Sequence, residues 1–160
     1  MSETEYFSTI DRLSSNPVFM SALFSWAIAQ LIKVIINIIR GKSEGMGASV
    51  ILFLWKTGGM PSSHSSAIVG ATTAIGFVNG VESSIFVLAF VMTIVVIRDA
   101  LGVRRSTGVQ AKAINYIGFK LNKSLNFNIT SVKEVNGHTF PEVAVGIILG
   151  FFIAVAFCNL

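Results

Sequence analysis

Four apolar segments constrain this chain more than any other feature of its sequence, because each is about as long as a helix that crosses a lipid bilayer. Such a helix needs about 20 predominantly apolar residues, with about 17 as a working minimum. Hydrophobic residues form 52% of the 160-residue chain and charged residues only 12%, which is too apolar for a soluble domain of this length. We expect an all-α, polytopic membrane helix bundle with about four spans: Pro17–Ile39, Ser62–Asn79, Ser83–Ile97 with its flanks, and Phe140–Asn159.

A shorter apolar stretch, Gly47–Trp55, lies between the first two spans. We interpret it as a half-helix or re-entrant piece, which membrane depth tolerates only where other protein covers it. A fifth, tilted span is the alternative. No internal repeat is evident, so residues 1–160 are expected to form one domain. The single Cys158 provides no disulfide framework, and the N-terminal residues lack the basic region of a cleaved signal peptide.

Positive charge predicts the orientation of the spans, because Lys and Arg concentrate in cytoplasmic loops. The connection between the first two spans contains Arg40, Lys42 and Lys56. The connection between the last two is richer still, with Arg98, Arg104, Arg105, Lys112, Lys120, Lys123 and Lys133. Both connections are therefore expected on the cytoplasmic side of a cell inner membrane, with both termini on the other side.

The long connection from Gly102 to His138 has helical periodicity of its own. Apolar residues recur at helical spacing, while glutamine and lysines occupy other positions; the apolar set is Val109, Ala113, Ile114, Ile117 and Leu121. This pattern predicts an amphipathic helix at the membrane interface, where anionic membrane lipids would favour it. The alternative is an ordinary solvated basic loop.

A polar cluster, Lys56-Thr-Gly-Gly-Met-Pro-Ser-Ser-His64, directly precedes the second span. A glycine-rich turn followed by Ser and His at a helix N-terminus suits an anion, because unpaired backbone N–H groups and the helix dipole both point toward it. Phosphate is the expected ligand. The candidate binding residues in this cluster are Lys56, Gly59, Ser62 and Ser63, and His64 is a candidate acid.

His138 and Glu142 precede and begin the last span, four residues apart. On a helix such residues share one face and lie within hydrogen-bonding reach. A carboxylate that holds one imidazole nitrogen leaves the other free to attack phosphorus. The alternative is structural: Glu142 simply stabilises the first turn of the helix through the helix dipole.

Asp99 follows Arg98 at the end of the third span, before Arg104 and Arg105. An ionised Asp near membrane depth is costly, so it is expected to be functional or paired with one of these arginines. The two arginines suit bidentate phosphate binding, although arginines also commonly flank spans. Lys33, inside the first span, is interpreted as a residue that extends toward the cytoplasmic side.

These motifs resemble those of the phosphatidic acid phosphatase type 2 superfamily, which includes vanadium haloperoxidases. Pro61–His64 resembles its Pro-Ser-Gly-His motif, with Ser63 in place of Gly, and His138–Glu142 resembles the end of its third motif, with Glu142 in place of Asp. The small, divergent membrane branch is matched more fully, by Gly58–His64, Asp99–Arg105 and Gly137–Thr139.

The resemblance implies that His138 is a nucleophile forming a phosphohistidine, that Glu142 orients it, and that His64 protonates the leaving alkoxide. Lys56, Ser63 and an arginine would bind the phosphate, and no metal or other cofactor would be needed. Two departures matter. The first motif's Arg-Pro pair is missing, and Val132 stands where the third motif has its Arg, so Arg104 or Arg105 would have to replace that cation.

The leading hypothesis is thus an integral-membrane lipid phosphatase that removes a terminal phosphate monoester at the cytoplasmic face. Its substrate would be of the phosphatidylglycerophosphate, phosphatidic acid or polyprenyl phosphate type, without any nucleic acid partner. The short chain leaves room for a homo-oligomer that completes the site. The alternatives are a non-catalytic anion- or lipid-binding membrane protein that retains the phosphate pocket and, less favoured, a small transporter subunit.

Overall fold

The computed structural model describes residues 11–41, 59–125, 129–134 and 137–159, whose regular structure is helical with no strand. The long helices are α2 (Pro17–Ile39), α4 (Ser63–Asn79), α5 (Ser84–Leu101), α6 (Val103–Leu125) and α7 (Phe140–Asn159). The predicted all-α membrane bundle is confirmed. The predicted re-entrant piece Gly47–Trp55 lies outside the described residues.

Local sequence explains where the helices begin and end. Asn16 precedes α2, and its side-chain oxygen accepts hydrogen bonds from the backbone N–H groups of Val18 and Phe19. Ser62 and Ser83 cap α4 and α5 in the same way. Gly80 ends α4 with a φ of +83°, which favours glycine. The connection from α4 to α5 is therefore a tight reversal.

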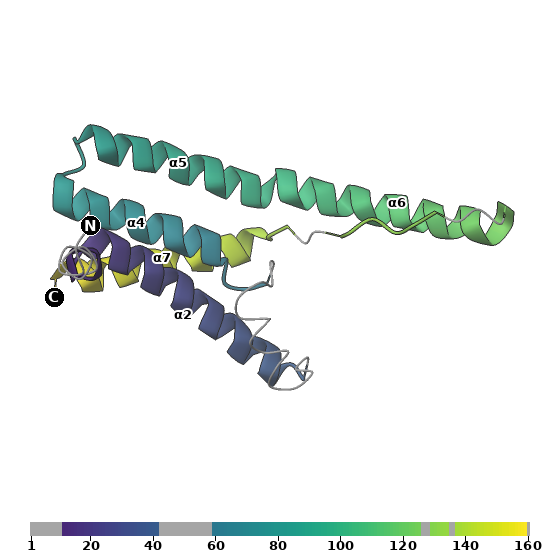
Figure 1. The fold of residues 1–160 in the computed structure, drawn as a ribbon, viewed down its shortest axis with the longest axis horizontal. Coiled ribbons are helices and arrows are strands. Elements are labelled where there is room, and N and C mark those ends of the chain that lie inside the picture. The colour runs from purple at the N-terminus through teal and green to yellow at the C-terminus, as the bar shows by residue number, and fades with distance from the viewer. Residues whose placement is uncertain (1–10, 42–58, 126–128, 135–136, 160) are drawn as a thin grey trace, which may run out of the picture.

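Helix α4 is the centre of the bundle, with α2, α5 and α7 packed around it (Figure 1). Small residues permit this close packing. A Cβ atom added at Gly146 of α7 would lie 2.5 Å from the carbonyl oxygen of Ser62, and one at Gly150 would collide with the carbonyl oxygen of Ser66. On its other side, Gly70 of α4 lies directly against Ser25 of α2. Small-residue interfaces of this kind are how helices associate inside membranes.

Three helical stretches of the described chain are long and apolar enough to cross a membrane: Pro17–Ile39, Ser84–Ser124 and Phe140–Asn159. The remaining predicted span, Ser62–Asn79, corresponds to α4, which is 17 residues long. Large apolar side chains cover the outside of the bundle, and Leu88 of α5 is 63% exposed. Such a surface fits lipid rather than water.

Helix α6 confirms that the long basic connection contains a helix, so the plain-loop alternative is wrong for residues 103–125. It continues the direction of α5 beyond the end of the bundle, and its apolar residues Val109 and Ile117 are 64% and 56% exposed (Figure 1). The return segment, defined here as residues 129–134, runs back beside it. Contact of α6 with the membrane surface stays a prediction.

Overpacking the interface between α4 and α7 should destabilise the bundle. We expect Gly150→Val to cost at least about 1–3 kcal/mol, because the new methyl groups meet the backbone of α4 rather than a movable side chain. Thermal unfolding of the detergent-solubilised protein measures this loss. Ile148→Val, at an exposed position of the same helix, should unfold like wild type, and equal stability of the two variants would contradict the packing described above.

Candidate functional site

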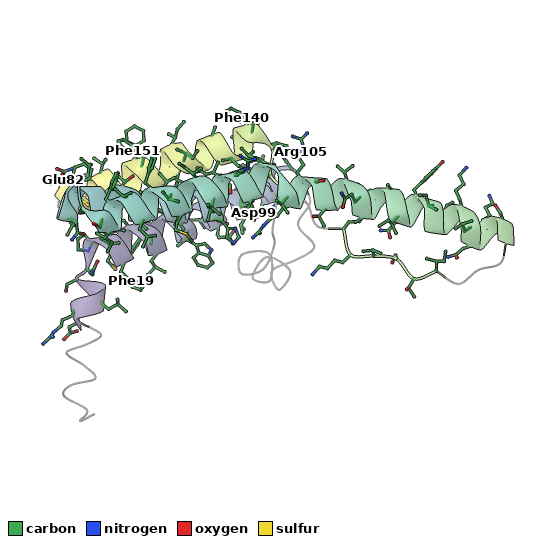
Figure 2. All side chains as sticks on the ribbon, turned by 90° about the horizontal axis from the view of Figure 1, so that it is seen from above. Phe19, Glu82, Asp99, Arg105, Phe140 and Phe151 are labelled. Atoms are coloured by element: carbon green, nitrogen blue, oxygen red, sulfur yellow. The ribbon has the colours of Figure 1, made fainter. Side chains whose placement is uncertain are left out.

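The site lies where α2 and α5 end and where α4 and α7 begin. Figure 2 shows Asp99, Arg105 and Phe140 toward this end of the bundle, whereas Glu82 lies at the opposite end. Helix direction alone thus gathers polar residues from four helices. A cavity of about 250 Å³ opens among them, and its lining residues are His64, Val95, Val96, Asp99, Ala100, Arg104 and His138.

His138 and Glu142 form the pair that their spacing predicts. The Nδ1 atom of His138 lies 3.3 Å from Oε2 of Glu142. The same carboxylate oxygen accepts a hydrogen bond of 2.9 Å from the backbone N–H of Thr139. Glu142 therefore does both things that the sequence left as alternatives, because it stabilises the start of α7 and holds the imidazole. A proton on Nδ1 leaves the lone pair of Nε2 free.

The surroundings of His138 favour its neutral form. The residue is only 5% exposed, and this burial is the main reason that its pKa is lowered from the usual value. The hydrogen bond and charge of Glu142 raise the pKa, while the positive charges of Lys33 and Arg104 lower it. The net effect is a lower pKa, so the imidazole is neutral at pH 7 and available as a nucleophile.

Lys33 is buried, which the sequence interpretation did not specify. The residue is 3% exposed, on the buried face of α2. Its Cγ and Cδ atoms lie 3.8 and 3.9 Å from where a Cβ atom of Gly59 would be. Among the described residues, none forms a hydrogen bond or ion pair with Lys33. A buried cation thus lies close enough to His138 to influence its charge.

A sequence signal for Lys33 did exist. Ser21, Ser25, Ala29 and Lys33 follow one another at intervals of four residues, and all four are buried. Small and polar residues on one face of an otherwise apolar membrane helix mark the side that packs against protein. The four-residue spacing of these small and polar residues predicts that Lys33 faces the other helices, even though it is charged.

Asp99 and Arg104 form an ion pair, with Nε of the arginine 2.7 Å from the carboxylate. Both side chains are partly exposed at the rim of the cavity. Of the three arginines that the sequence offered as partners, Arg104 is the one that pairs with Asp99. Arg105 is exposed and does not line this cavity. Arg104 is therefore the arginine placed to meet an anion beside His138.

The serines of the polar cluster that precedes the second span, called the glycine-serine motif from here on, are buried. Ser62 is fully buried, its hydroxyl lies 2.9 Å from that of Ser65, and its backbone N–H donates to the carbonyl oxygen of Glu142 at 2.9 Å. Ser62 thus ties α4 to α7, and neither it nor Ser63 lines the 250 Å³ cavity. Gly59 adopts a φ of +88° beside Lys33. Lys56 lies outside the described residues, and no cluster of three or more metal-ligating His, Cys, Asp or Glu occurs within them.

Fold and site together define a class: a polytopic helical membrane protein with a histidine–carboxylate pair and several cations at one end of the bundle. Comparison with known proteins also indicates a membrane protein. The chain belongs to the divergent PAP2 family, whose model matches residues 14–153. It is 32% identical over 152 residues to YuiD, an uncharacterized membrane protein of Bacillus subtilis (strain 168), covering 88% of this chain and 93% of that protein. No solved structure matches the chain.

The charges around His138 predict opposite pKa changes in two variants. Lys33→Met removes a positive charge and should raise the pKa of His138, whereas Glu142→Gln removes a negative partner and should lower it further. The ¹⁵N chemical shifts of labelled histidine followed against pH measure both, in a His64→Gln background that leaves one histidine. A pKa that moves the same way in both variants would refute the arrangement.

Proposed function

We propose that this protein is a lipid phosphatase that hydrolyses terminal phosphate monoesters through a phosphohistidine intermediate. The observation that carries the proposal is the buried His138, held at Nδ1 by Glu142 and neutral at pH 7, in a cavity shared with His64 and Arg104. Membership of the divergent PAP2 family supports it. Phosphoryl transfer to a histidine needs this set of a positioned nucleophile, an acid and cations for the phosphate oxygens.

The reaction proceeds in two displacements. Arg104 of the cavity lining holds the phosphate oxygens, Lys33 contributes its positive charge from beside the cavity, and Nε2 of His138 attacks phosphorus while the ester P–O bond breaks. The proton on Nδ1 stays with Glu142 as its acceptor, and His64, which enters this step as the imidazolium, gives its extra proton to the departing alkoxide. Water then attacks the phosphohistidine, with His64 taking a proton from it, so that inorganic phosphate leaves and both histidines return to their starting states.

In this proposal, Lys33 replaces the third-motif arginine, which the superfamily has six residues before the histidine that corresponds to His138. At that position Val132 lies in the return segment, where its backbone N–H and C=O both bond to Asn115. The cation comes instead from α2, across the bundle from Arg104. A buried ammonium that has no partner among the described residues is costly in a membrane protein, and an anionic substrate would offset that cost when it binds.

The cavity walls favour a substrate with a lipid tail. Val95 and Val96 of α5 form the apolar side of the cavity, and Val95 is 54% exposed on the outer, apolar surface of the bundle. An acyl or prenyl chain can lie along this wall while its phosphate reaches His138. Phosphatidylglycerophosphate, phosphatidic acid and polyprenyl phosphates all have this form. The excess of Lys and Arg near this end of the bundle supports a site at the cytoplasmic face of an inner membrane.

The second candidate is a non-catalytic lipid- or anion-binding protein with the same pocket. The ion pair of Asp99 with Arg104 favours it, because that carboxylate occupies the one arginine of the cavity and repels an incoming phosphate. In the phosphatase, substrate must compete with Asp99 for Arg104. In the binding protein, the competition would set affinity alone.

Loss of the histidines distinguishes the two candidates. We expect wild type to release phosphate from at least one member of a panel of lipid and polyprenyl phosphates in the presence of EDTA. His138→Ala should lose at least about 10³-fold in kcat, and His64→Ala about 10²- to 10⁴-fold. Lys112→Ala, an exposed cation of α6, serves as the control. Binding of a substrate phosphate that survives His138→Ala, without product from wild type, would replace the phosphatase by the binding protein.

Removal of the buried cation tests how the phosphate is held. Lys33→Met should lower kcat/KM by about 10- to 100-fold, since a charge-assisted hydrogen bond contributes about 1.5–3 kcal/mol. Lys33→Arg should retain part of the activity. Lys112→Met, the matched loss of an exposed lysine, should leave kcat/KM within about twofold. An unchanged kcat/KM in Lys33→Met would remove Lys33 from the phosphate site.

A further inference from the structure

We infer that Asn115 and Asn122 of α6 are positioning residues, which hold the return segment along α6 and thereby set the place of His138. The proposed phosphatase has a nucleophile that precedes α7 and is not part of a helix. Something must therefore fix the chain that leads to it. This inference rests on the proposed function for its catalytic consequence, but its structural core is independent of that function.

The two asparagines bind the return segment as a neighbouring strand would. Asn115 accepts a hydrogen bond from the backbone N–H of Val132 at 2.7 Å and donates one to the carbonyl oxygen of the same residue at 2.9 Å. It also donates to the Glu134 carboxylate at 2.9 Å. Asn122 accepts from the N–H of Ile129 at 2.9 Å and donates to its carbonyl oxygen at 3.1 Å. Each amide thus satisfies both polar groups of one residue.

The spacing of the asparagines fixes the register of the return segment. Seven residues separate Asn115 from Asn122, which is about 10.5 Å along an α-helix. Ile129 and Val132 are three residues apart, which is about 10 Å in an extended chain. Because these lengths agree, both amides can bond at once in one register, and a shift by one residue would break both pairs of bonds.

Between the asparagines, α6 has a glycine that lets the segment approach. A Cβ atom added at Gly118 would lie 3.3 Å from Cγ2 and 3.7 Å from Cβ of Ile129. Gly108 and Ala111 continue this face of small buried residues toward the start of α6. The stripe Gly108, Ala111, Asn115, Gly118 and Asn122 alternates steps of three and four residues, which is one face of a helix. The return segment contacts this face at Asn115, Gly118 and Asn122.

The segment leads directly to the nucleophile. Gly137 lies against the backbone of Arg104 and Arg105, at a distance that admits no side chain. The backbone N–H of His138 then donates to the carbonyl oxygen of Ala100, in the last turn of α5, at 3.2 Å. Asn115 and Asn122 therefore hold the chain a few residues before its next contacts with the helices, at Gly137 and His138. Ile129 and Val132 are 41% and 47% exposed, so their side chains are only partly buried, and the four amide bonds to their backbone specify the position of the segment.

The test replaces both amides by an apolar side chain of similar size, Asn115→Leu with Asn122→Leu. Its first measurement does not need activity: the rate at which diethyl pyrocarbonate modifies His138, followed by peptide mass in a His64→Gln background. At 5% exposure His138 should react slowly, and the double variant should react about 10- to 30-fold faster, as expected for the loss of several modest hydrogen bonds. Gln110→Leu, on α6 but not bonded to the return segment, should react like the parent.

A disulfide offers a rescue that a merely destabilised protein would not show. The 3.7 Å between a Gly118 Cβ and the Cβ of Ile129 fits a disulfide. Gly118→Cys with Ile129→Cys, in a Cys158→Ala background, should restore slow modification of His138 to the double leucine variant when oxidised, and lose it again when reduced.

Activity supplies the second measurement, with His64 intact. The double leucine variant should lose kcat about 10-fold or more with KM nearly unchanged, and the oxidised cross-link should recover kcat. A modification rate equal to the parent's, or a faster rate that the cross-link leaves unchanged, would overturn the inference. Silence of wild type toward every phosphate substrate would count against the proposed phosphatase alone, because the modification and cross-linking results would still decide the role of the asparagines.

Discussion

The close contact between α4 and α7 is the constraint on which the rest of this molecule depends. Gly146 and Gly150 let the backbone of α7 touch the carbonyl oxygens of Ser62 and Ser66, and the N–H of Ser62 bonds to the carbonyl oxygen of Glu142. These contacts bring the starts of two helices together, and with them the glycine-serine motif and the histidine–carboxylate pair. Any wider spacing would separate the two halves of the site, which are far apart in sequence.

Electrostatics at this end of the bundle combine opposing demands. Burial of His138 is the main reason that its pKa is lowered, and the positive charges of Lys33 and Arg104 lower it further. Burial also makes the Lys33 cation costly in a membrane protein. Arg104 is partly exposed and pairs with Asp99, while Glu142 bonds to the ring of His138. The result is a site of mixed charge in which Lys33, unlike these groups, has no ion-pair or hydrogen-bond partner among the described residues.

Much of this arrangement was predictable from sequence, because membrane helices are long, apolar and regular. The helix positions, the pairing of His138 with Glu142 and the helix inside the basic connection all follow from periodicity and spacing. The burial of Lys33 was not predicted, since a charge in an apolar run was judged without the serines that share its face. Asn115 and Asn122 gave no signal, because their partners are backbone atoms of a segment without regular structure. Contacts between side chains and distant backbone leave no pattern in one sequence.

His138 is joined to two different helices. Its backbone bonds to Ala100 at the end of α5, while its ring bonds to Glu142 on α7. α5 lies on the outside of the bundle and continues into α6 with one interruption, at Gly102. A displacement of α6 that shifts the last turn of α5 relative to α7 would therefore change how His138 is held. The position of the imidazole is in this way connected to a helix that extends beyond the bundle.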